Sequence, residues 1–558
     1  MTDSRTGGQL VAECLALHGA DTVFTVPGES FLAVLDALYD HPQIRLVVCR
    51  QEGGAANMAD AYGKLTGRPG VCMVTRGPGA ANAAVGVHTA FQDSTPMVVL
   101  IGDVQRDAQE REAFQEVDFK QMYGPLAKWV ARIEDPARVP EMMSRAFYTA
   151  VSGRPGPVVL TLPEDMLTQS ATATLGDPYK VVRPAPAEAD MERLRALLAG
   201  ARAPFMIVGG GGWSAETAAD IMAFAEANAL ATGASFRCQD YFDNTHACYA
   251  GHVGIGLEPA LAARIKAADL LIVVGARLGE MTTSGYTLID IPRPRQTLVH
   301  VHGGVEELGR VYQADLPINA GSTAFAAAAR RVRPVDPAAW RASTAAAHDE
   351  YLATLQPTPM PGTLDMGVVM KILSARLPAD AIMTNGAGNY TGWLHRFYPF
   401  RTYRTQLAPT SGAMGYGVPS AVAAKLVHPE RTVISFNGDG CFLMCGQELS
   451  TAVRYGLDPV FLVINNGMYG TIRMHQEREY PGRVSGTDLV NPDFVAYARA
   501  FGAHGELVEK TADFESALGR ALGAGRAALL ELRIDPEAIT TKTTLSAIRA
   551  SSRKGRRA

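Results

Sequence analysis

The chain has 558 residues, 47% of them hydrophobic and 19% charged, with 55 glycines and 33 prolines. This length suggests about three domains, and the composition is that of a globular protein rather than a disordered chain, a coiled coil or collagen. A net charge of −4 provides no general positive field to attract nucleic acid.

The cysteines and the two ends of the chain further limit which class of protein this can be. The seven cysteines are odd in number and contain no C-x-x-C pair, so we expect neither a disulfide framework nor a zinc site. Met1–Leu10 is polar, which predicts no signal peptide, and no apolar run reaches the ~18 residues of a membrane span. We therefore expect a cytoplasmic protein without a membrane partner, whose basic end, Arg549–Ala558, is a solvated, frayed terminus.

Short runs rich in Val, Ile and Leu recur along the chain, and Ala-rich amphipathic stretches lie between them. Continuous apolar runs are typical of buried parallel strands, and their alternation with helices predicts α/β domains with doubly wound parallel sheets. The predicted helices include Leu10–His18 and Glu52–Leu65. The predicted strands are Thr22–Val26, Ile44–Cys49, Val71–Thr75, Met97–Ile101, Val158–Leu162, Phe205–Val208, Leu270–Val274, Thr432–Phe436 and Val460–Ile464.

Two proline-rich stretches, Asp177–Ala187 and Gln356–Thr363, divide the chain. Such stretches favour extended surface linkers. They predict three domains at residues 1–170, 190–335 and 360–540, followed by a basic tail at 541–558.

The third predicted domain carries two polar strand ends. The strand Thr432–Phe436 runs into Gly438-Asp439-Gly440, and Val460–Ile464 runs into Asn465-Asn466-Gly467, with Asp439 and Asn466 27 residues apart. Glycines let a ligand approach the backbone closely, and carboxylate and amide oxygens suit Mg²⁺ or Ca²⁺. Two ordinary turns would be the plainer interpretation, but ligands of open α/β sheets bind at the carboxyl ends of strands. The pair therefore predicts a metal and ligand site.

This pair of motifs resembles the cofactor signature of thiamine diphosphate (ThDP) enzymes, GDG followed by NN. The resemblance implies a pyrimidine-binding first domain, a central nucleotide-binding-like domain and a diphosphate-binding third domain. It also implies ThDP and Mg²⁺ as cofactors, with Asn465 supporting the loop. The implied metal ligands are the side chains of Asp439 and Asn466 and the backbone carbonyl of Met468, and the implied cofactor-binding residues also include Gly438 and Gly440.

A glutamate at the start of a predicted helix is the candidate acid/base. Glu52 opens the segment E-G-G-A-A-N-M-A-D-A-Y after the strand Ile44–Cys49. Such a residue is usually a charge favoured by the helix dipole. The resemblance instead implies a buried catalytic carboxyl that shares a proton with N1′ of the aminopyrimidine. In the family the pyrimidine and diphosphate sides come from different subunits, which implies a homodimer or homotetramer.

Ser411–Pro419 contains a methionine among glycines. A methionine there is often a packing residue in a turn. The resemblance makes Met414 the wedge that bends the cofactor so that its reacting groups meet, and it gives the Gly412 carbonyl to the 4′-amino group.

As a whole, residues 5–545 resemble the acetolactate synthase group. The resemblance extends to VPG at 26–28, VTRGPGAAN at 74–82, DSTP at 93–96, FQEVD at 114–118 and GAR at 275–277. It implies that Phe114 and Gln115 approach the thiazolium ring, although either residue could simply be packing. Arg277 could hold a substrate carboxylate or a nucleotide, or form an ordinary surface ion pair.

Three departures from related enzymes bear on the reaction. The chain contains no His-His pair, Ile472 stands where decarboxylases carry a glutamate, and Thr75 stands where benzoylformate decarboxylase carries a histidine. A site poor in proton donors favours carboligation over aldehyde release. The tryptophan of biosynthetic acetolactate synthases is missing near Met474 and His475, so a preference for 2-oxobutyrate is in doubt.

These patterns predict a carboligase that decarboxylates a 2-oxoacid such as pyruvate and transfers the hydroxyalkyl carbanion to a second carbonyl. The alternatives are a 2-oxoacid decarboxylase or 2-hydroxyacyl-CoA/aldehyde lyase, and a non-catalytic relative, which the intact motif residues disfavour. FAD stays open, because His302 stands at a strand end that is acidic in flavin-containing members and the run Gly209–Gly212 is weak support. The sequence names neither the natural acceptor nor a regulatory subunit.

Overall fold

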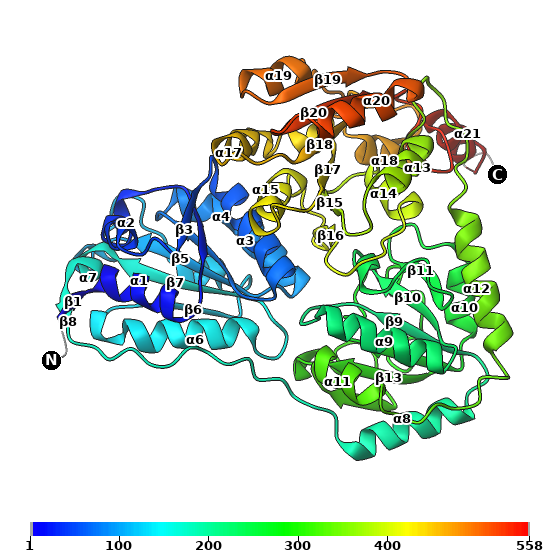
Figure 1. The fold of residues 1–558 in the computed structure, drawn as a ribbon, viewed down its shortest axis with the longest axis horizontal. Coiled ribbons are helices and arrows are strands. Elements are labelled where there is room, and N and C mark those ends of the chain that lie inside the picture. Colours follow the sequence, from blue (N-terminus) through cyan, green and yellow to red (C-terminus); the bar gives the residue numbers. More distant parts are fainter. Residues whose placement is uncertain (1–3, 556–558) are drawn as a thin grey trace. The chain divides into compact units, whose positions relative to one another are not determined.

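The computed structural model describes residues 4–555, and the chain divides into two compact units between Arg183 and Pro184. Three six-stranded sheets, all parallel, carry the fold, one in the first unit and two in the second (Figure 1). The prediction of an α/β protein with three parallel-sheet domains is confirmed.

The sheet of the first unit has the strand order β3-β2-β4-β5-β7-β6. Its order reverses between β2 and β4, which makes the carboxyl ends of these two strands the expected ligand crevice. The strands are β2 (Thr22–Thr25), β3 (Arg45–Val48), β4 (Gly70–Val74), β5 (Met97–Asp103), β6 (Trp129–Arg132) and β7 (Pro157–Pro163). A short antiparallel pair, β1 (Arg5–Thr6) and β8 (Ser170–Ala171), lies outside this sheet.

Helices cover both faces of this sheet. Successive strand residues point to opposite faces, and both sets are apolar and buried. One apolar cluster joins alternate strand residues such as Val71 and Met73 to Leu10 of α1 and Phe147 of α6. On the other face α3 and α4 pack against each other. The helices are α1 (Gly7–Leu17), α2 (Leu32–Tyr39), α3 (Glu52–Thr66), α4 (Pro78–Asp93), α5 (Phe119–Tyr123), α6 (Val139–Val151) and α7 (Glu164–Thr168).

The central sheet of the second unit has the order β11-β10-β9-β12-β13-β14, the arrangement of dinucleotide-binding folds. Its strands are β9 (Pro204–Val208), β10 (Ala231–Ser235), β11 (Tyr249–Val253), β12 (Leu270–Val274), β13 (Thr297–His302) and β14 (Leu316–Asn319). Its helices are α8 (Glu188–Gly200), α9 (Ala215–Ala227), α10 (Pro259–Ala267), α11 (Ser322–Ala329) and α12 (Arg341–Thr354).

The last sheet has the order β16-β15-β17-β18-β20-β19, so the strand order reverses between β15 and β17. Its strands are β15 (Ile382–Asn385), β16 (Gln406–Leu407), β17 (Val433–Gly438), β18 (Val460–Asn465), β19 (His504–Val508) and β20 (Ala528–Arg533). Its helices are α13 (Met366–Arg376), α14 (Thr391–Phe397), α15 (Gly417–Val427), α16 (Asp439–Phe442), α17 (Leu449–Arg454), α18 (Gly470–Glu479), α19 (Phe494–Ala500), α20 (Thr511–Leu522) and α21 (Leu545–Gly555).

The predicted linkers carry no regular structure: residues 172–187 and 355–365 contain neither helix nor strand. All seven cysteines are buried and none forms a disulfide. Across residues 4–555, no helix has the length and apolar character needed to cross a bilayer.

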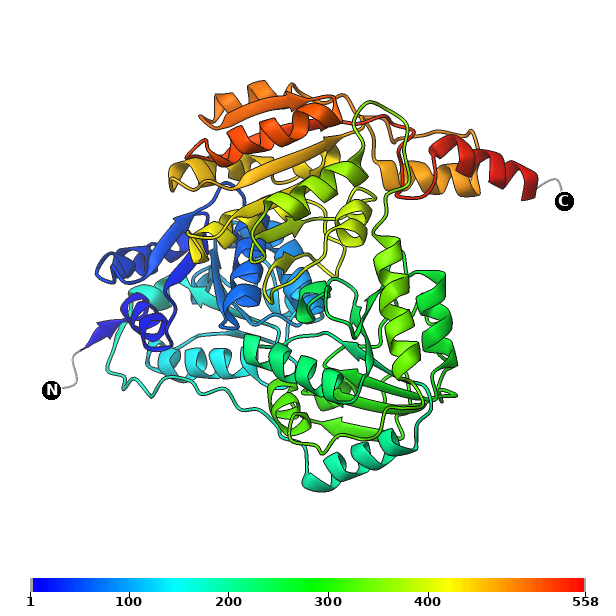
Figure 2. The same cartoon turned by 45° about the vertical axis from the view of Figure 1, so that its right-hand side comes forward.

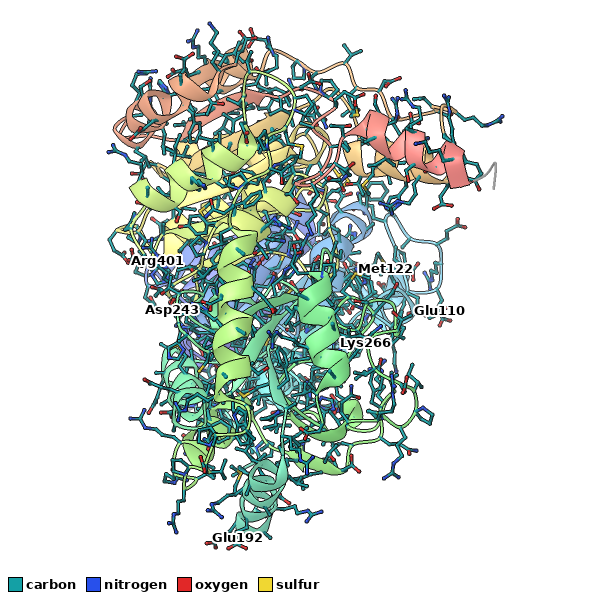
Figure 3. All side chains as sticks on the ribbon, turned by 90° about the vertical axis from the view of Figure 1, so that its right-hand side faces the viewer. Glu110, Met122, Glu192, Asp243, Lys266 and Arg401 are labelled. Carbon is teal, nitrogen blue, oxygen red and sulfur yellow. The ribbon has the colours of Figure 1, made fainter. Side chains whose placement is uncertain are left out.

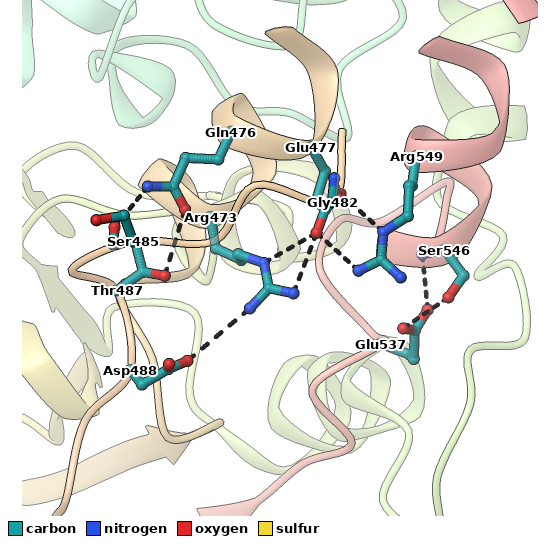
Figure 4. A network of polar contacts seen from close by, with 10 residues as sticks. All are labelled: Arg473, Gln476, Glu477, Gly482, Ser485, Thr487, Asp488, Glu537, Ser546 and Arg549. Carbon is teal, nitrogen blue, oxygen red and sulfur yellow. Dashed lines mark hydrogen bonds and ion pairs between the residues drawn. The ribbon is translucent and has the colours of Figure 1, made fainter. Parts of the chain in front are cut away.

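The prediction of a frayed basic tail is wrong for the part of the tail that the structure describes, because Leu545–Gly555 forms α21. Figure 2 shows α21 running alongside α18. Two nitrogens of Arg549 donate to the two oxygens of the buried Glu477 at 2.7 Å each, and Arg473 donates to the same carboxylate at 3.1 Å (Figure 4). Hydrogen bonds led by that from Arg549 hold the pKa of Glu477 at about 2. Arg556 and Arg557 lie outside the described residues.

Candidate active site

Three loops leave the carboxyl ends of neighbouring strands in the last sheet. The loop 386–389 follows β15, Gly438-Asp439-Gly440 ends β17 and opens α16, and Asn465–Met468 follows β18. Since β15 and β17 flank the reversal of strand order, the first two loops border the expected ligand crevice. The predicted GDG and NN motifs therefore stand on adjacent, hydrogen-bonded strands.

The Asp439 carboxylate is buried, with 3% of the residue exposed, and is held by three donors. Its Oδ1 accepts from the Gly440 N–H at 2.9 Å, and its Oδ2 accepts from the Gly467 N–H at 2.9 Å and from Asn491 Nδ2 at 2.8 Å. Burial raises the pKa of Asp439, while these hydrogen bonds favour its ionised form. The fixed carboxylate is a suitable anionic ligand for a hard cation.

The NN loop supplies further oxygen donors beside Asp439. The Asn466 Oδ1 accepts from the Met468 N–H at 3.2 Å, and Gly467 between them has a positive φ of 67°. The Met468 side chain packs in a small apolar cluster with Met474 and Leu545, so α18 and α21 hold this loop from outside. A carboxylate, an amide oxygen and a backbone carbonyl are oxygen ligands of the kind that Mg²⁺ takes beside the phosphate oxygens of a ligand, so these residues fit the implied cofactor.

The glycines of these loops are required by close packing. A Cβ on Gly438 would lie 2.8 Å from the Tyr390 ring, and one on Gly440 would lie 2.6 Å from the Tyr469 ring. A Cβ on Gly386 would lie 2.5 Å from Cys441 Sγ. Part of the motif therefore serves the packing of this domain itself.

The predicted wedge loop is tied to the GDG helix. The Gly415 N–H donates to Cys441 Sγ at 3.2 Å, and the Tyr390 hydroxyl donates to the same sulfur at 3.1 Å. Met414 is half-buried against the domain core, whereas Gly412 is exposed with a φ of +70° and open space around it. The structure thus brings Met414 and Gly412 beside the segment that carries Asp439.

Ile472 and His475 lie on α18, directly after the NN loop. Both are exposed in this chain, Ile472 by 55%, while Met474 between them is buried. The Thr471 hydroxyl on the same helix bonds Asn389 in both directions, donating to Asn389 Oδ1 at 3.1 Å and accepting from its N–H at 2.8 Å. This contact joins α18 to the loop after β15.

In the first unit, Glu52 begins α3, where the Gln51 side chain caps the helix through the Gly54 N–H at 2.9 Å. The Glu52 Oε2 accepts from Asn82 Nδ2 of α4 at 2.9 Å. The carboxyl is half-buried rather than fully buried, so the expected burial is only partly reached within one chain. A Cβ on Gly79 would lie 3.4 Å from Glu52 Oε1, which leaves the carboxyl beside the start of α4.

The loops around Glu52 converge on the predicted crevice of the first sheet. Thr75 Oγ1 lies 2.8 Å from Ser30 Oγ, and a Cβ on Gly28 would lie 2.5 Å from Thr75. Gln115, with a φ of 64°, lies against Gly77, whose Cβ would be 2.8 Å away. Phe114 is 72% exposed. Glu110 and Met122, labelled in Figure 3, flank this segment in the chain.

Arg277 of the central domain forms an ion pair. Its Nε donates to Glu307 Oε2 at 3.3 Å, and Arg310 donates to the other oxygen of that buried carboxylate at 3.0 Å. Of the alternatives for Arg277, this geometry favours the ion pair.

The crevice of the central sheet is occupied by the domain's own side chains. The Gly209 carbonyl accepts from Trp213 Nε1 at 2.8 Å, and the Gly210 carbonyl accepts from the Tyr241 hydroxyl at 2.7 Å. A Cβ on Gly210 would lie 1.8 Å from the Gly275 carbonyl oxygen. The glycine run therefore packs against the end of β12.

The histidine that replaces an acidic strand end is also engaged within the domain. The buried His302 accepts the Gly304 N–H on Nδ1 at 3.0 Å, and its neighbour His300 lies 3.1 Å from the Ala276 carbonyl. Burial lowers the pKa of His300 to about 4, so this ring is neutral. These residues do not fit the ribose-binding role of an acidic strand end.

Sequence reasoning missed two parts of the site. The loop 386–389 follows a strand that was not predicted, although the run N-G-A-G-N after Ile382–Asn385 was a usable signal. Asn491 gave no signal, because it stands 52 residues from Asp439 in a loop of ordinary composition.

Comparison with known proteins agrees with this geometry. Three family models match: the thiamine pyrophosphate enzyme N-terminal TPP binding domain at residues 5–122, the central domain at 191–328 and the C-terminal TPP binding domain at 386–532. The acetolactate synthase large subunit of Corynebacterium glutamicum is 32% identical over 92% of this chain and 84% of its own length. The acetolactate synthase isozyme 2 large subunit of Escherichia coli K12 is 31% identical over 95% of both chains.

The chain belongs to the thiamine pyrophosphate enzyme family. Within that family it is an acetolactate synthase-like enzyme that depends on thiamine pyrophosphate, as the resemblance implied.

Proposed function

We propose that this enzyme is a carboligase of acetolactate synthase type that uses Mg²⁺ to hold ThDP. It takes a small 2-oxoacid such as pyruvate, removes CO₂ and joins the remaining hydroxyalkyl group to a second carbonyl compound. The observation that carries this proposal is the lack of strong proton donors at positions 75 and 472.

Bound ThDP supplies the nucleophilic carbon that attacks the 2-oxoacid and stabilises the electron pair left by CO₂. Asp439 and Asn466, through their side chains, and Met468, through its carbonyl, would hold the cation through which the diphosphate is retained. Glu52 would exchange a proton with N1′ of the aminopyrimidine. Met414 would support the cofactor from below, and the Gly412 carbonyl would accept from its 4′-amino group.

Positions 75 and 472 decide whether the product is an aldehyde or a ligated acid. Thr75 places a hydroxyl beside Ser30, and a hydroxyl is a much weaker acid than the histidine of related decarboxylases. Ile472 offers no proton at all. Because few groups can protonate the hydroxyalkyl carbon, attack on a second carbonyl competes well.

We propose a homodimer or homotetramer, since the resemblance implies that one subunit contributes Glu52 and another subunit contributes the metal loop. Gln115 and Phe114 would approach the thiazolium ring from the side of Glu52. We further propose that the enzyme is cytoplasmic and has no nucleic acid or membrane partner. The composition of the chain is consistent with this.

We propose that the central domain holds no flavin at its glycine run. The crevice there is filled by Trp213 and Tyr241, and the strand end that would face a ribose carries His302. The central domain then serves as a structural partner of the last domain, and no part of the proposed reaction depends on FAD.

A second function is a decarboxylase, or a lyase acting on a 2-hydroxyacyl-CoA or an aldehyde-derived substrate. The observation that favours it is the pair Met474 and His475 in place of a tryptophan, since Met474 is buried and His475 exposed. This difference alters the region where an acceptor would bind.

A screen of 2-oxoacids, each supplied alone and with candidate acceptors, tests these functions. The purified enzyme is loaded with ThDP and Mg²⁺, and products are identified by mass spectrometry. We expect acetolactate-type products from pyruvate. Aldehyde alone supports the decarboxylase, and no turnover of any 2-oxoacid contradicts the carboligase proposal.

A further inference from the structure

A chain of four polar side chains runs from β20 of the last sheet to the Asp439 carboxylate. Glu531 Oε1 at the end of β20 accepts from Asn465 Nδ2 at 2.8 Å. Asn465 Oδ1 accepts from Asn491 Nδ2 at 3.0 Å, and the same Nδ2 donates to Asp439 Oδ2 at 2.8 Å. Only Asp439 of these four was a predicted metal ligand.

The order of donors and acceptors in this chain is set by groups that can act in one direction only. Glu531, 2% exposed, forms an ion pair with Arg533 at 3.1 Å, so it is a carboxylate that only accepts. The Asn465 amide must therefore present its NH₂ to Glu531 and its oxygen to Asn491, and the Gly467 N–H, which also donates to Asn465 Oδ1 at 3.1 Å, enforces the same orientation. That oxygen in turn fixes the Asn491 amide with its NH₂ toward Asp439.

The arrangement at Asp439 has a direct consequence for a cation. The two hydrogen bonds from Gly467 and Asn491 occupy both lone pairs of Oδ2, whereas Oδ1 accepts one from Gly440. Oδ1 therefore keeps a lone pair, and the carboxylate cannot rotate without breaking the bond from Asn491. The buried carboxylate is oriented before any ligand binds.

Stability alone does not explain why an amide occupies position 491. The Asn491 Oδ1 is buried and accepts no hydrogen bond from any residue in the described range 4–555. An unsatisfied buried acceptor is destabilising, so an amide at this position lowers the stability of the fold. The NH₂ group of the same amide donates to both Asp439 and Asn465, and these two hydrogen bonds explain why an amide stands there.

We propose that Asn491 is a positioning residue that orients Asp439 for Mg²⁺, and that Glu531 acts through Asn465 to orient Asn491. This inference rests on the proposed function of Asp439 as a ligand of the ion that holds ThDP. It assigns to two residues outside the GDG and NN motifs a part in cofactor retention.

The test measures cofactor binding rather than activity. ThDP is titrated into apo-protein by calorimetry at several fixed Mg²⁺ concentrations, for the unaltered protein and for Asn491→Ala and Asn491→Asp. Loss of a residue that orients a metal ligand typically weakens metal affinity by about 10–100-fold. We expect an apparent ThDP affinity weakened by about that factor at low Mg²⁺ in Asn491→Ala, with recovery as Mg²⁺ rises. Asn491→Asp should be weaker still, because a second carboxylate would face Asp439.

A matched pair of glutamates provides the control. Glu531 and Glu506 both line an open cleft of about 550 Å³ at the carboxyl ends of β18, β19 and β20. Glu506 pairs with Arg520, whereas Glu531 bonds Asn465. Glu531→Gln replaces the carboxylate that holds the Asn465 NH₂ with a neutral amide, while the Gly467 N–H still donates to Asn465 Oδ1. The chain of hydrogen bonds is then held less firmly, and we expect up to about tenfold weaker ThDP binding, with no change in Glu506→Gln.

The outcomes separate this inference from the proposed function. Normal Mg²⁺-dependent ThDP affinity in Asn491→Ala overturns the positioning role, while failure of the unaltered protein to bind ThDP with Mg²⁺ overturns the proposed function. A weakening that excess Mg²⁺ does not relieve, together with a lowered melting temperature of the apo-protein, shows a merely structural role and also overturns it. If Asn491→Ala does not fold, Glu531→Gln against Glu506→Gln decides.

Discussion

The central and last sheets of the second unit both reverse their strand order between two glycine-bearing loops, yet the two crevices have different contents. In the central sheet, Trp213 and Tyr241 donate to the carbonyls of the glycine run. In the last sheet, the equivalent place holds the buried Asp439 carboxylate with donors fixed behind it. A glycine run at a strand end thus locates a crevice, and the polar groups beside it show whether the crevice is filled from within or prepared for a ligand.

The sheet of the first unit extends this comparison, because its strand order follows the same pattern as that of the last sheet. Among the described residues of this unit, the buried Asp103 accepts from a backbone N–H, that of Val104, but it lies at the end of β5 rather than at the crevice between β2 and β4. Instead, Glu52 stands half-buried at a helix start with one side-chain partner, Asn82. The same topology therefore carries a buried carboxylate held by three donors in one sheet and a half-buried carboxyl bonded to Asn82 in the other.

The largest expected effect comes from Glu52→Gln, which removes the proton-exchanging group and keeps its shape. We expect turnover to fall by about 10²–10⁴-fold, the usual contribution of an acid/base, with ThDP affinity nearly unchanged. Steady-state kinetics and calorimetry measure the two quantities. Glu141→Gln, at an exposed residue of α6 that pairs with Arg138, is the matched control. Near-normal turnover in Glu52→Gln would remove Glu52 from the mechanism.

Asp439→Ala alters the other crevice and should give the opposite pattern. The diphosphate loses the anionic ligand of its cation, so we expect ThDP affinity to fall by about 100-fold or more, beyond the effect of residues that only orient a ligand. Calorimetry at fixed Mg²⁺ measures this change. Unchanged affinity would mean that the buried carboxylate is structural, like the filled crevice of the central sheet.

Ile472→Glu tests the chemistry at the rim of the last crevice. A carboxyl there should raise the yield of aldehyde relative to ligated product by about tenfold, since a barrier difference of about 1.4 kcal/mol has that effect. The product ratio at saturating 2-oxoacid is compared in both proteins. Ile472→Gln, which adds a polar group without an acid, is the control. Equal ratios in all three proteins would mean that position 472 does not face the reacting carbon.

The smallest expected effect is in the filled crevice. Trp213→Phe removes the donor to the Gly209 carbonyl, and we expect stability against urea to fall by about 1–2 kcal/mol without a change in ThDP affinity. Neither protein should take up FAD in equilibrium dialysis. Stoichiometric FAD in the unaltered protein would show that the central crevice opens to a ligand. The contrast between the central and last sheets would then be wrong.

The sequence predicted the parts of the molecule that have strong local patterns. The strand Leu270–Val274 is confirmed to the residue, because a continuous apolar run is sufficient for a buried parallel strand. The strand Ala231–Ser235 was missed, since A-T-G-A-S contains no such run and is buried only through its neighbours. The frayed-tail prediction failed because composition could not show that the buried Glu477 would pair with Arg549.

The candidate active site was likewise predicted only where its residues form a local sequence pattern. Asp439, Asn466 and Glu52 stand in motifs that can be recognised along the chain, and their roles as ligands and acid/base stay predictions. Asn491 and Glu531 became visible only through contacts across three strands, because donor and acceptor geometry between distant segments has no linear pattern.

In the proposed reaction, the carbon left after loss of CO₂ is passed to a second carbonyl compound. The most direct test supplies pyruvate alone to the enzyme loaded with ThDP and Mg²⁺, and measures pyruvate consumed, CO₂ released and acetaldehyde formed. Carboligation predicts two pyruvates consumed per CO₂, with acetolactate as the product. One pyruvate per CO₂ with an equal amount of acetaldehyde would contradict the claim.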